Sequence, residues 1–247
     1  MKPNVLIVTP AYQEWNNLLE LLPRVLEQLS LLGVDSKWLI VSENLVVNYN
    51  AYQALELSKN VEVCPRSAGM ESFAEALQIG INKISLHDYI VFMDGDQSHQ
   101  PEQIRKLVEI LDNSNNVDIA ISSRYVDGGS SENSLVLKSM SKFLNFVFRK
   151  FLKIDAKDIS TNFKAFRTPL LRDVELISKN FEAVEELLMH ATNRLGRSPR
   201  IQEIPDTFTT RIHGTSKRKL GQFIGTYLMS LFFLKRKIRR QAPKNPQ

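Results

Sequence analysis

Short apolar, β-branched runs alternate with longer stretches of helical periodicity through the first half of this chain. The expected strands are Val5–Thr9, Trp38–Val41, Val61–Cys64, Tyr89–Met93 and Val117–Ile121. The expected helices between them are Asn16–Leu32, Tyr49–Leu57, Ser72–Ile84 and Pro101–Leu111. Strands and helices that alternate at this spacing predict βαβ units around a mainly parallel sheet. The fold class is therefore α/β.

The second half is more irregular. A loop over residues 125–133 precedes further expected elements, namely the helices Leu137–Leu152, Phe181–Leu195 and Lys217–Arg240 and the strands Asn162–Phe166 and Ile201–Phe208. A length of 247 residues suits one α/β domain of ordinary size with a short appendage. We expect one domain over residues 1–217, followed over residues 218–247 by an amphipathic, basic helix and a short disordered tail.

Composition excludes several classes of protein. The single cysteine, Cys64, rules out an internal disulfide and a cysteine-rich zinc site. The apolar run near the N-terminus is too short for a signal peptide, and no segment is apolar enough to span a bilayer, so we expect a cytoplasmic protein. Much of the basic excess behind the net charge of +5 lies after residue 210, which indicates a local anion-binding device.

Polar clusters follow four of the expected strands. They are Thr9–Glu14, Ser42–Asn44, Asp94–His99 and Ser122–Tyr125. In an open parallel sheet, ligands bind at the carboxyl ends of the strands. One polar strand end is commonplace, but four on the same edge predict a binding site.

Asp94 and Asp96 are separated by one glycine directly after a strongly apolar strand. Two carboxylates this close repel each other unless a cation neutralises them, and Mg²⁺ or Mn²⁺ prefers such oxygen ligands together with phosphate oxygens. An isolated pair of this kind is more often a solvated turn in which Asp96 caps a helix. The apolar strand before the pair, with His99 and Pro101 after it, favours a metal site at Asp94 and Asp96.

The chain resembles the polyprenyl-phosphate glycosyltransferases, the dolichyl-phosphate mannosyltransferase branch of glycosyltransferase family 2. Six segments carry the resemblance in the family's order and rough spacing: Pro10–Glu14, Asp94–Pro101, Ser123–Tyr125, Ser141–Asn145, Asp158–Phe163 and Phe208–Lys217. Glu186–Leu188 lies at the place of the family's later acidic helix. The last of the six segments fits the pattern F-x-x-R-x-x-G-x-S-K fully.

The resemblance implies a GT-A fold and inverting transfer of a hexose, mannose or glucose, to a polyprenyl or dolichyl phosphate. It implies GDP-mannose or UDP-glucose as donor, and Mg²⁺ or Mn²⁺ held by Asp94 and Asp96. The residues expected to contact the donor are Pro10, Tyr12, Glu14, Glu43, Arg66, Asp94 and Gln97. The groups expected to hold phosphate or take part in the transfer are Asp96, Arg124, Lys142, Arg211, Ser216, Lys217 and Glu186.

One departure from the family pattern leaves the donor base open, and two other functions are possible. The family's paired aspartates after the second strand are replaced by Ser42 and Glu43, so the donor base is not determined. A family 2 enzyme acting on a hydroxyl of a glycan or other polymer would need a carboxylate base, for which Glu186 or Glu185 would serve. A non-catalytic protein that binds nucleic acid or membrane through the basic end is the other alternative, although no nucleic-acid module is recognisable.

The final expected helix has an apolar stripe and a basic end. This pattern is typical of an interfacial helix on an anionic membrane, and equally of a helix that packs on its own domain. If the first alternative holds, the protein associates peripherally with the cytoplasmic face of a membrane or with a membrane-anchored partner.

Overall fold

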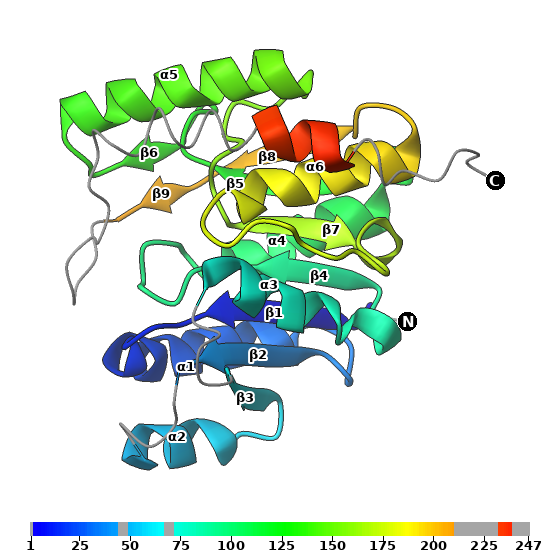
Figure 1. Cartoon of the computed structure of the whole chain (residues 1–247). Coiled ribbons are helices and arrows are strands. Elements are labelled where there is room, and N and C mark those ends of the chain that lie inside the picture. Colours follow the sequence, from blue (N-terminus) through cyan, green and yellow to red (C-terminus); the bar gives the residue numbers. More distant parts are fainter. Residues whose placement is uncertain (1, 44–48, 67–71, 210–231, 239–247) are drawn as a thin grey trace.

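The computed structural model describes residues 2–43, 49–66, 72–209 and 232–238. Its main strands are β1 (Val5–Pro10), β2 (Lys37–Ser42), β3 (Val61–Pro65), β4 (Tyr89–Phe92), β5 (Ile119–Ser123), β7 (Lys164–Arg167) and β8 (Ile201–Pro205). They form one seven-stranded sheet in the order β3-β2-β1-β4-β7-β5-β8 (Figure 1). Two short strands, β6 (Ser130–Ser131) and β9 (Thr207–Phe208), pair in parallel beside it. The predicted α/β fold with a mainly parallel sheet is confirmed.

Helices cover both faces of the sheet. One face packs against α1 (Trp15–Ser30), α2 (Tyr49–Glu56) and α4 (Gln103–Asn113), and the other against α3 (Phe73–Ile81), α5 (Leu135–Leu152), α6 (Ala183–Leu195) and residues 232–238. Two short 3-10 helices, η2 (Ile84–Leu86) and η3 (Thr168–Leu170), complete the elements. Successive residues of β1 alternate between the two cores, and both cores are apolar, which is why the strand reads as a continuous apolar run.

Strand β7 runs antiparallel to both of its neighbours. Its first residue, Lys164, lies opposite Phe92, the last residue of β4, and opposite Ile121 near the end of β5. The chain therefore leaves β5 and enters β7 at the same edge of the sheet. The segment between these two strands, which includes α5, therefore starts and ends at the carboxyl edge, where the parallel strands end.

Only part of the expected final helix lies in the described part of the chain. Residues 232–238 are helical, and Leu234 and Ile238 are buried in the same core as α5 and α6. Asn193 of α6 donates its side-chain amide to the Ile238 carbonyl at 3.4 Å. Among the described helices, none combines the length and the apolar character needed to cross a membrane.

Candidate active site

The turn after β4 places Asp94 and Asp96 at the carboxyl edge of the sheet. Gly95 lies tightly against β1, since a β-carbon there would come within 2.9 Å of Thr9 Cγ2. Asp96 is buried and accepts hydrogen bonds from the backbone N–H of Ser98, at 3.1 Å, and from the hydroxyl of the same residue. The side chain of Asp94 is 30% exposed. One carboxylate is thus fixed within the turn, and the other reaches the surface.

Asn162 approaches Asp94 from the loop before β7. Its side-chain Nδ2 donates to Asp94 Oδ1 at 2.9 Å. The amide oxygen of Asn162 is buried and has no hydrogen-bond partner within the described residues. Asn162 lies within the motif segment Asp158–Phe163, but no feature of the sequence assigns it a role, because only the antiparallel course of β7 brings it to this turn.

His99 lies behind Asp94, with its ring between those of Phe163 and Phe208 at centroid distances of 5.0 and 5.4 Å. Its Nδ1 is 3.1 Å from Asp206 Oδ2, and its Nε2 is 3.7 Å from Asp94 Oδ2. Burial alone would lower the pKa of His99. Hydrogen bonding to Asp206 and Asp94 outweighs burial and raises the pKa from 6.5 to about 9. The imidazole is thus cationic between two carboxylates.

The oxygen atoms at this turn are suitable ligands for a hard divalent cation. No cluster of three or more His, Cys, Asp or Glu side chains in the described ranges forms a complete metal site. Mg²⁺ and similar ions do not need one, because they bind through one or two carboxylates and take further oxygens from substrate phosphates and water. Asp94 and Asp96, with the partnerless amide oxygen of Asn162 beside them, supply oxygen atoms of this kind.

Glu43 and Arg66 are both buried and join the ends of β1, β2 and β3. Arg66 donates to the carbonyl oxygens of Ala11 at 2.8 Å, Ser42 at 3.3 Å and Ser72 at 3.2 Å. Glu43 Oε1 accepts from the backbone N–H of Gln13 at 2.6 Å, and Oε2 lies 4.0 Å from Arg66 Nη2. Both residues were predicted to contact the donor, and the structure places them in the frame that shapes its expected binding turn.

The turn after β1 carries the other predicted donor contacts. Tyr12 is 38% exposed, while Pro10 and Glu14 are half-buried. Gln97, also predicted as a donor contact, instead points at α1: its Nε2 donates to Asn17 Oδ1 at 3.0 Å and to Glu20 Oε2 at 2.7 Å. Its backbone adopts φ +63°, which turns the side chain away from the two aspartates. No pattern in the sequence indicates this reversal.

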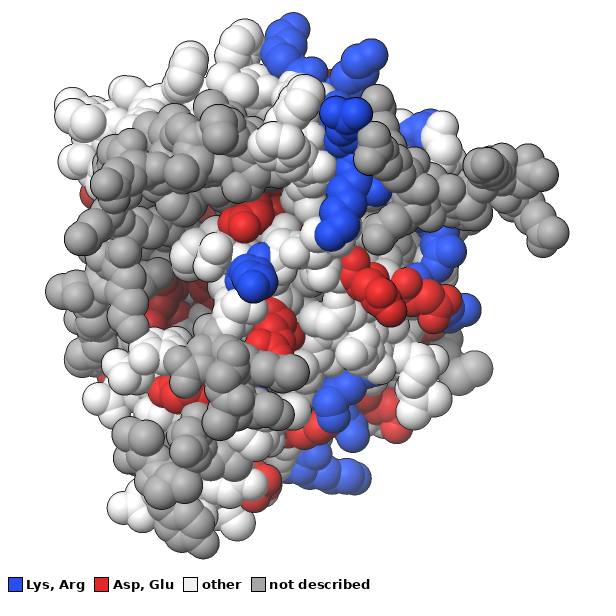
Figure 2. Space-filling model, viewed as in Figure 1, with Lys and Arg blue, Asp and Glu red and all other residues white. Residues whose placement is uncertain are grey.

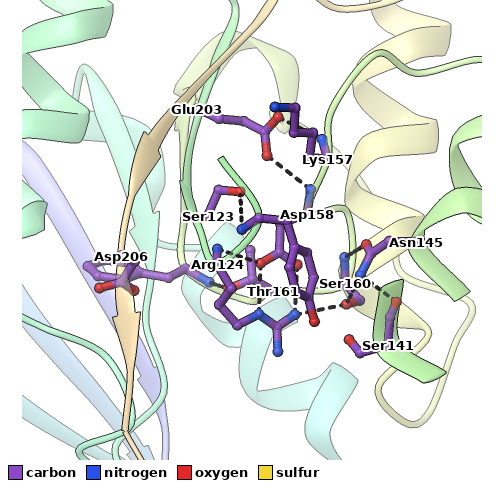
Figure 3. A network of polar contacts seen from close by, with 12 residues as sticks. Ser123, Arg124, Ser141, Asn145, Lys157, Asp158, Ser160, Thr161, Glu203 and Asp206 are labelled. Atoms are coloured by element: carbon purple, nitrogen blue, oxygen red, sulfur yellow. Dashed lines mark hydrogen bonds and ion pairs between the residues drawn. The ribbon is translucent and has the colours of Figure 1, made fainter. Parts of the chain in front are cut away.

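Arg124, at the end of β5, is the centre of a polar network (Figure 3). Its Nε and Nη2 donate to the two carboxylate oxygens of the fully buried Asp158, each at 2.7 Å, and Nη2 also reaches Ser160. Its guanidinium lies over the rings of Tyr125, at 5.1 Å, and Phe208, at 5.3 Å. Burial would raise the pKa of Asp158, but Arg124 holds it below its usual range. The described part of the chain leaves Nη1 of Arg124 without a partner, and so available to an anion.

Helix α5 brings Lys142 to the same place. Its Nζ lies 5.7 Å from the centroid of the Tyr125 ring that also contacts Arg124. The helix is held there by Asn145, whose amide donates to Ser160 Oγ and accepts from the Ser160 backbone N–H, both at 3.0 Å (Figure 3). Two cations from separate elements thus flank one aromatic ring. The sequence analysis predicted that both would hold phosphate.

Lys164 is a buried cation that sequence reasoning did not single out. It is 1% exposed and donates to the Thr161 carbonyl oxygen. Burial lowers the pKa of Lys164 to about 8, although the negative charges of Glu185 and Asp158 oppose the shift. It places a positive charge beneath the edge of the sheet that carries Asp94 and Arg124.

Glu186 is fully buried, and both of its oxygens are used within the fold. They accept from the backbone N–H groups of Ile177 at 2.7 Å and Ser178 at 2.9 Å, and His190 lies 3.4 Å away. Glu186 was predicted to take part in the transfer, and the structure shows it anchoring the loop before α6. Its neighbour Glu185 is also fully buried and acts electrostatically on Lys164.

The predicted phosphate-binding residues Arg211, Ser216 and Lys217 lie outside the described residues. The last described residue before them, Thr209, is fixed to the turn after β4. Its backbone N–H donates to the Ser98 carbonyl at 3.0 Å, and its hydroxyl donates to the Gln97 carbonyl at 2.9 Å. The C-terminal motif thus begins in contact with the turn that carries Asp94 and Asp96.

Two curated mannosyltransferases are similar in sequence to this chain. Dolichol-phosphate mannosyltransferase from Pyrococcus furiosus is 35% identical over 234 residues, which cover 93% of this chain and 63% of that protein. Undecaprenyl-phosphate mannosyltransferase from Micrococcus luteus is 34% identical over 138 residues, 55% of either chain. The chain therefore spans less than two thirds of the length of these curated relatives.

Solved structures show the same fold. Glucosyl-3-phosphoglycerate synthase from Mycobacterium tuberculosis superposes with a TM-score of 0.67 at 16% identity, over 94% of this chain and 80% of that one. Its complex with Mn²⁺, UDP and phosphoglyceric acid gives a TM-score of 0.63, over 95% and 75%. The predicted GT-A fold is confirmed. A family model described as glycosyl transferase family 2 matches residues 6–175, more than half of the sequence, and this chain therefore belongs to glycosyl transferase family 2.

Proposed function

We propose that this chain is a metal-dependent, inverting glycosyltransferase that moves a hexose from a nucleotide-sugar to a polyprenyl phosphate. One observation carries the proposal: a carboxylate pair suited to a cation-bound diphosphate and a cationic pair suited to a phosphate meet at one edge of the sheet. Phe208 links them, since its ring contacts both His99 beside Asp94 and the guanidinium of Arg124. Similarity to polyprenyl-phosphate mannosyltransferases supports this class of acceptor.

The residues suit a phosphate nucleophile. A phosphate monoester is ionised near neutral pH, so its oxygen can attack the anomeric carbon without a strong general base. The new carbon–oxygen bond forms as the bond to the diphosphate oxygen breaks on the opposite side of the sugar. Mg²⁺ or Mn²⁺, when bound by Asp94 and Asp96, neutralises charge on the departing diphosphate. Arg124 and Lys142 hold the acceptor phosphate. Three residues of the C-terminal motif join them in this proposal: Arg211, Ser216 and Lys217.

A hydroxyl acceptor would need a carboxylate base that faces the acceptor. Two residues are the sequence candidates for that role. Glu185 is fully buried and acts electrostatically on Lys164. Glu186 accepts hydrogen bonds from two backbone N–H groups and the Ser178 hydroxyl, and it contacts His190. Burial would raise the pKa of Glu186, but these hydrogen bonds lower it, so the carboxylate is a poor proton acceptor. This arrangement favours the phosphate acceptor over a glycan hydroxyl.

The donor is assigned to the turn after β1, with Pro10, Tyr12 and Glu14 along the nucleotide. Glu43 stands behind this turn with one oxygen, Oε2, that lacks a hydrogen-bond partner among the described residues. A nucleobase N–H would satisfy that oxygen. Both a uracil and a guanine offer such a donor, and both GDP-mannose and UDP-glucose remain candidates.

A lipid acceptor requires the site to meet a membrane surface, and α5 suits that contact. It exposes a row of apolar and basic side chains on its outer face: Leu135, Val136, Lys142, Phe143, Phe146 and Lys150. Lys and Arg side chains form a column that starts at the upper edge of the molecule, where α5 lies (Figure 2). Such a face binds anionic lipid through apolar insertion and charge together. We assign this face of α5 to peripheral attachment on the cytoplasmic side. Residues 218–247 can add to it only outside Leu234 and Ile238, which are buried in the domain core.

The test is transfer of radiolabelled hexose to a polyprenyl phosphate in mixed micelles with Mn²⁺, for GDP-mannose and UDP-glucose separately. We expect a solvent-extractable lipid product with one donor, its loss with EDTA, and a fall of at least 100-fold in Asp96→Asn. Asp155→Asn is the matched control, because that side chain is 95% exposed. Transfer to a glycan hydroxyl but not to the phosphate would refute the acceptor, and undiminished turnover in Asp96→Asn would refute the metal site.

A further inference from the structure

Asp206 is a buried carboxylate at the junction of β8 and β9 that no motif and no step of the proposed reaction uses. Its side chain has no exposed surface, and its Oδ1 finds no hydrogen-bond partner among the residues that the structure describes. Its backbone is fixed on both sides: the N–H donates to the Ser123 carbonyl at 2.9 Å, and the carbonyl accepts from Ser130 at 2.8 Å. A buried, half-satisfied carboxylate destabilises a fold, so its presence calls for a functional reason.

The second oxygen of Asp206 faces His99, and through it the exposed carboxylate of the metal turn. Asp206 Oδ2 lies 3.1 Å from His99 Nδ1, and His99 Nε2 lies 3.7 Å from Asp94 Oδ2. A carboxylate only accepts hydrogen bonds, so Asp206 selects the ring orientation in which Nδ1–H points at itself and Nε2 points at Asp94. The rings of Phe163 and Phe208 keep the imidazole in that plane.

We propose that Asp206 is a positioning residue of the metal site, which acts through His99 to fix the carboxylate of Asp94 toward the cation. This inference rests on the proposed function, because it requires Asp94 to be a metal ligand. Asp96 has its own support from Ser98 within the turn. The more exposed Asp94 is contacted from other segments, by the amide of Asn162 and, at the end of the line of contacts from Asp206, by His99. Partners of this kind, one step behind a metal ligand, typically change metal affinity by about 10- to 100-fold when they are removed.

The same segment supports the turn at a second point. Three residues after Asp206, Thr209 hydrogen-bonds to the carbonyl groups of Ser98 and Gln97. Between the two contacts, Phe208 packs against His99 and against Arg124. The β8–β9 segment therefore aligns the metal ligand with the phosphate-binding arginine.

The experiment measures Mn²⁺ binding by the full chain, in the presence of UDP and of GDP, by electron paramagnetic resonance of the free ion. We expect Asp206→Asn to weaken Mn²⁺ affinity by about 10-fold or more. The matched control is Asp118→Asn. Asp118 is a buried aspartate that directly precedes the first residue of β5, and it is paired with Arg197 and Arg200. We expect that control to lower the melting temperature and to leave Mn²⁺ affinity within twofold of the unmutated chain.

A double-mutant cycle separates positioning from general damage. His99→Gln keeps a side-chain N–H donor for Asp94 and lacks the ring nitrogen that Asp206 holds. In that background, Asp206→Asn should change Mn²⁺ affinity by less than about twofold, because the route through His99 is already cut. An equal effect of Asp206→Asn in both backgrounds would overturn the proposal.

A further variant covers the case in which Asp206→Asn does not fold. His99→Phe keeps an aromatic ring between Phe163 and Phe208 and removes both nitrogens, and we expect the same loss of Mn²⁺ affinity. Unaltered Mn²⁺ affinity in a folded Asp206→Asn or His99→Phe protein, with binding abolished in Asp96→Asn, would overturn this inference and leave the proposed function standing. Absence of Mn²⁺ binding by the unmutated chain with either nucleotide would overturn the proposed metal site, and this inference with it.

Discussion

Substitution of Arg124 by lysine separates the structural task of its guanidinium, the contact with Asp158, from the phosphate-binding task that we propose for it. Nε and Nη2 hold the buried Asp158, which leaves Nη1 for the acceptor phosphate. A lysine ammonium presents its donors from one nitrogen and cannot hold both carboxylate oxygens and a phosphate at once. Loss of one charge-assisted hydrogen bond costs about 1.5–3 kcal/mol, which corresponds to about 10- to 150-fold in kcat/KM for the polyprenyl phosphate.

The assay is initial-rate transfer as a function of acceptor concentration, with melting temperature recorded in parallel. Arg197→Lys is the matched control, since Arg197 also binds both oxygens of a buried aspartate, Asp118, but at the opposite edge of the sheet. We expect Arg124→Lys to lose acceptor kcat/KM and Arg197→Lys to lose only stability. Acceptor kcat/KM within threefold of the unmutated chain in Arg124→Lys, or an equal loss in the control, would refute the reasoning.

Three further outcomes are expected. Burial opposes ionisation of Asp118, but Arg197 and Arg200 outweigh burial and lower the pKa of Asp118 from 3.8 to about 2. The ionised Asp118 with its two arginines therefore stabilises the fold above about pH 4, and this contribution is lost as the pH falls toward 2. Because both arginines are half-exposed, this contribution to the free energy of unfolding is about 1–2 kcal/mol. Urea titrations of the unmutated chain and Asp118→Asn at pH 6 and pH 2.5 measure it, and the two free energies of unfolding should converge at the lower pH. Glu186→Gln should lower the melting temperature by several degrees yet change acceptor kcat/KM less than Arg124→Lys does; a larger catalytic than thermal loss would argue for direct catalysis. Gly95→Ala should weaken Mn²⁺ binding, measured by calorimetry, because the added β-carbon forces the turn away from β1.

The strands and helices could be predicted because each buries an apolar face of the expected period. Strand β1 is buried almost throughout, and Trp38 of β2 is wholly buried with its indole N–H donated to Thr9 at 2.9 Å. The direction of β7 could not be predicted, since four apolar or alternating residues fit a strand of either direction. That direction depends on where the chain re-enters the sheet, which is a property of tertiary packing.

The predicted site residues divide by the kind of signal they carry. Asp94, Asp96, Arg124 and Lys142 follow strands or lie within motifs, and the structure brings the elements that carry them to one edge. Gln97 belongs to the same motif but turns into α1, because its left-handed backbone conformation depends on polar partners in a helix about 80 residues away in sequence. Local sequence carries no record of such partners.

Buried charges explain both the precision of this site and the difficulty of predicting it. Three buried ion pairs among the described residues join segments distant in sequence: Arg124 with Asp158, Arg66 with Glu43, and His99 with Asp206. Burying one charge unpaired would cost several kcal/mol, so removal of either member displaces its partner as well. In every pair at least one member follows a strand at the carboxyl edge. The pairs therefore fix the turns at this edge of the sheet, and much of the motif serves to position the few groups assigned to contact the proposed substrates.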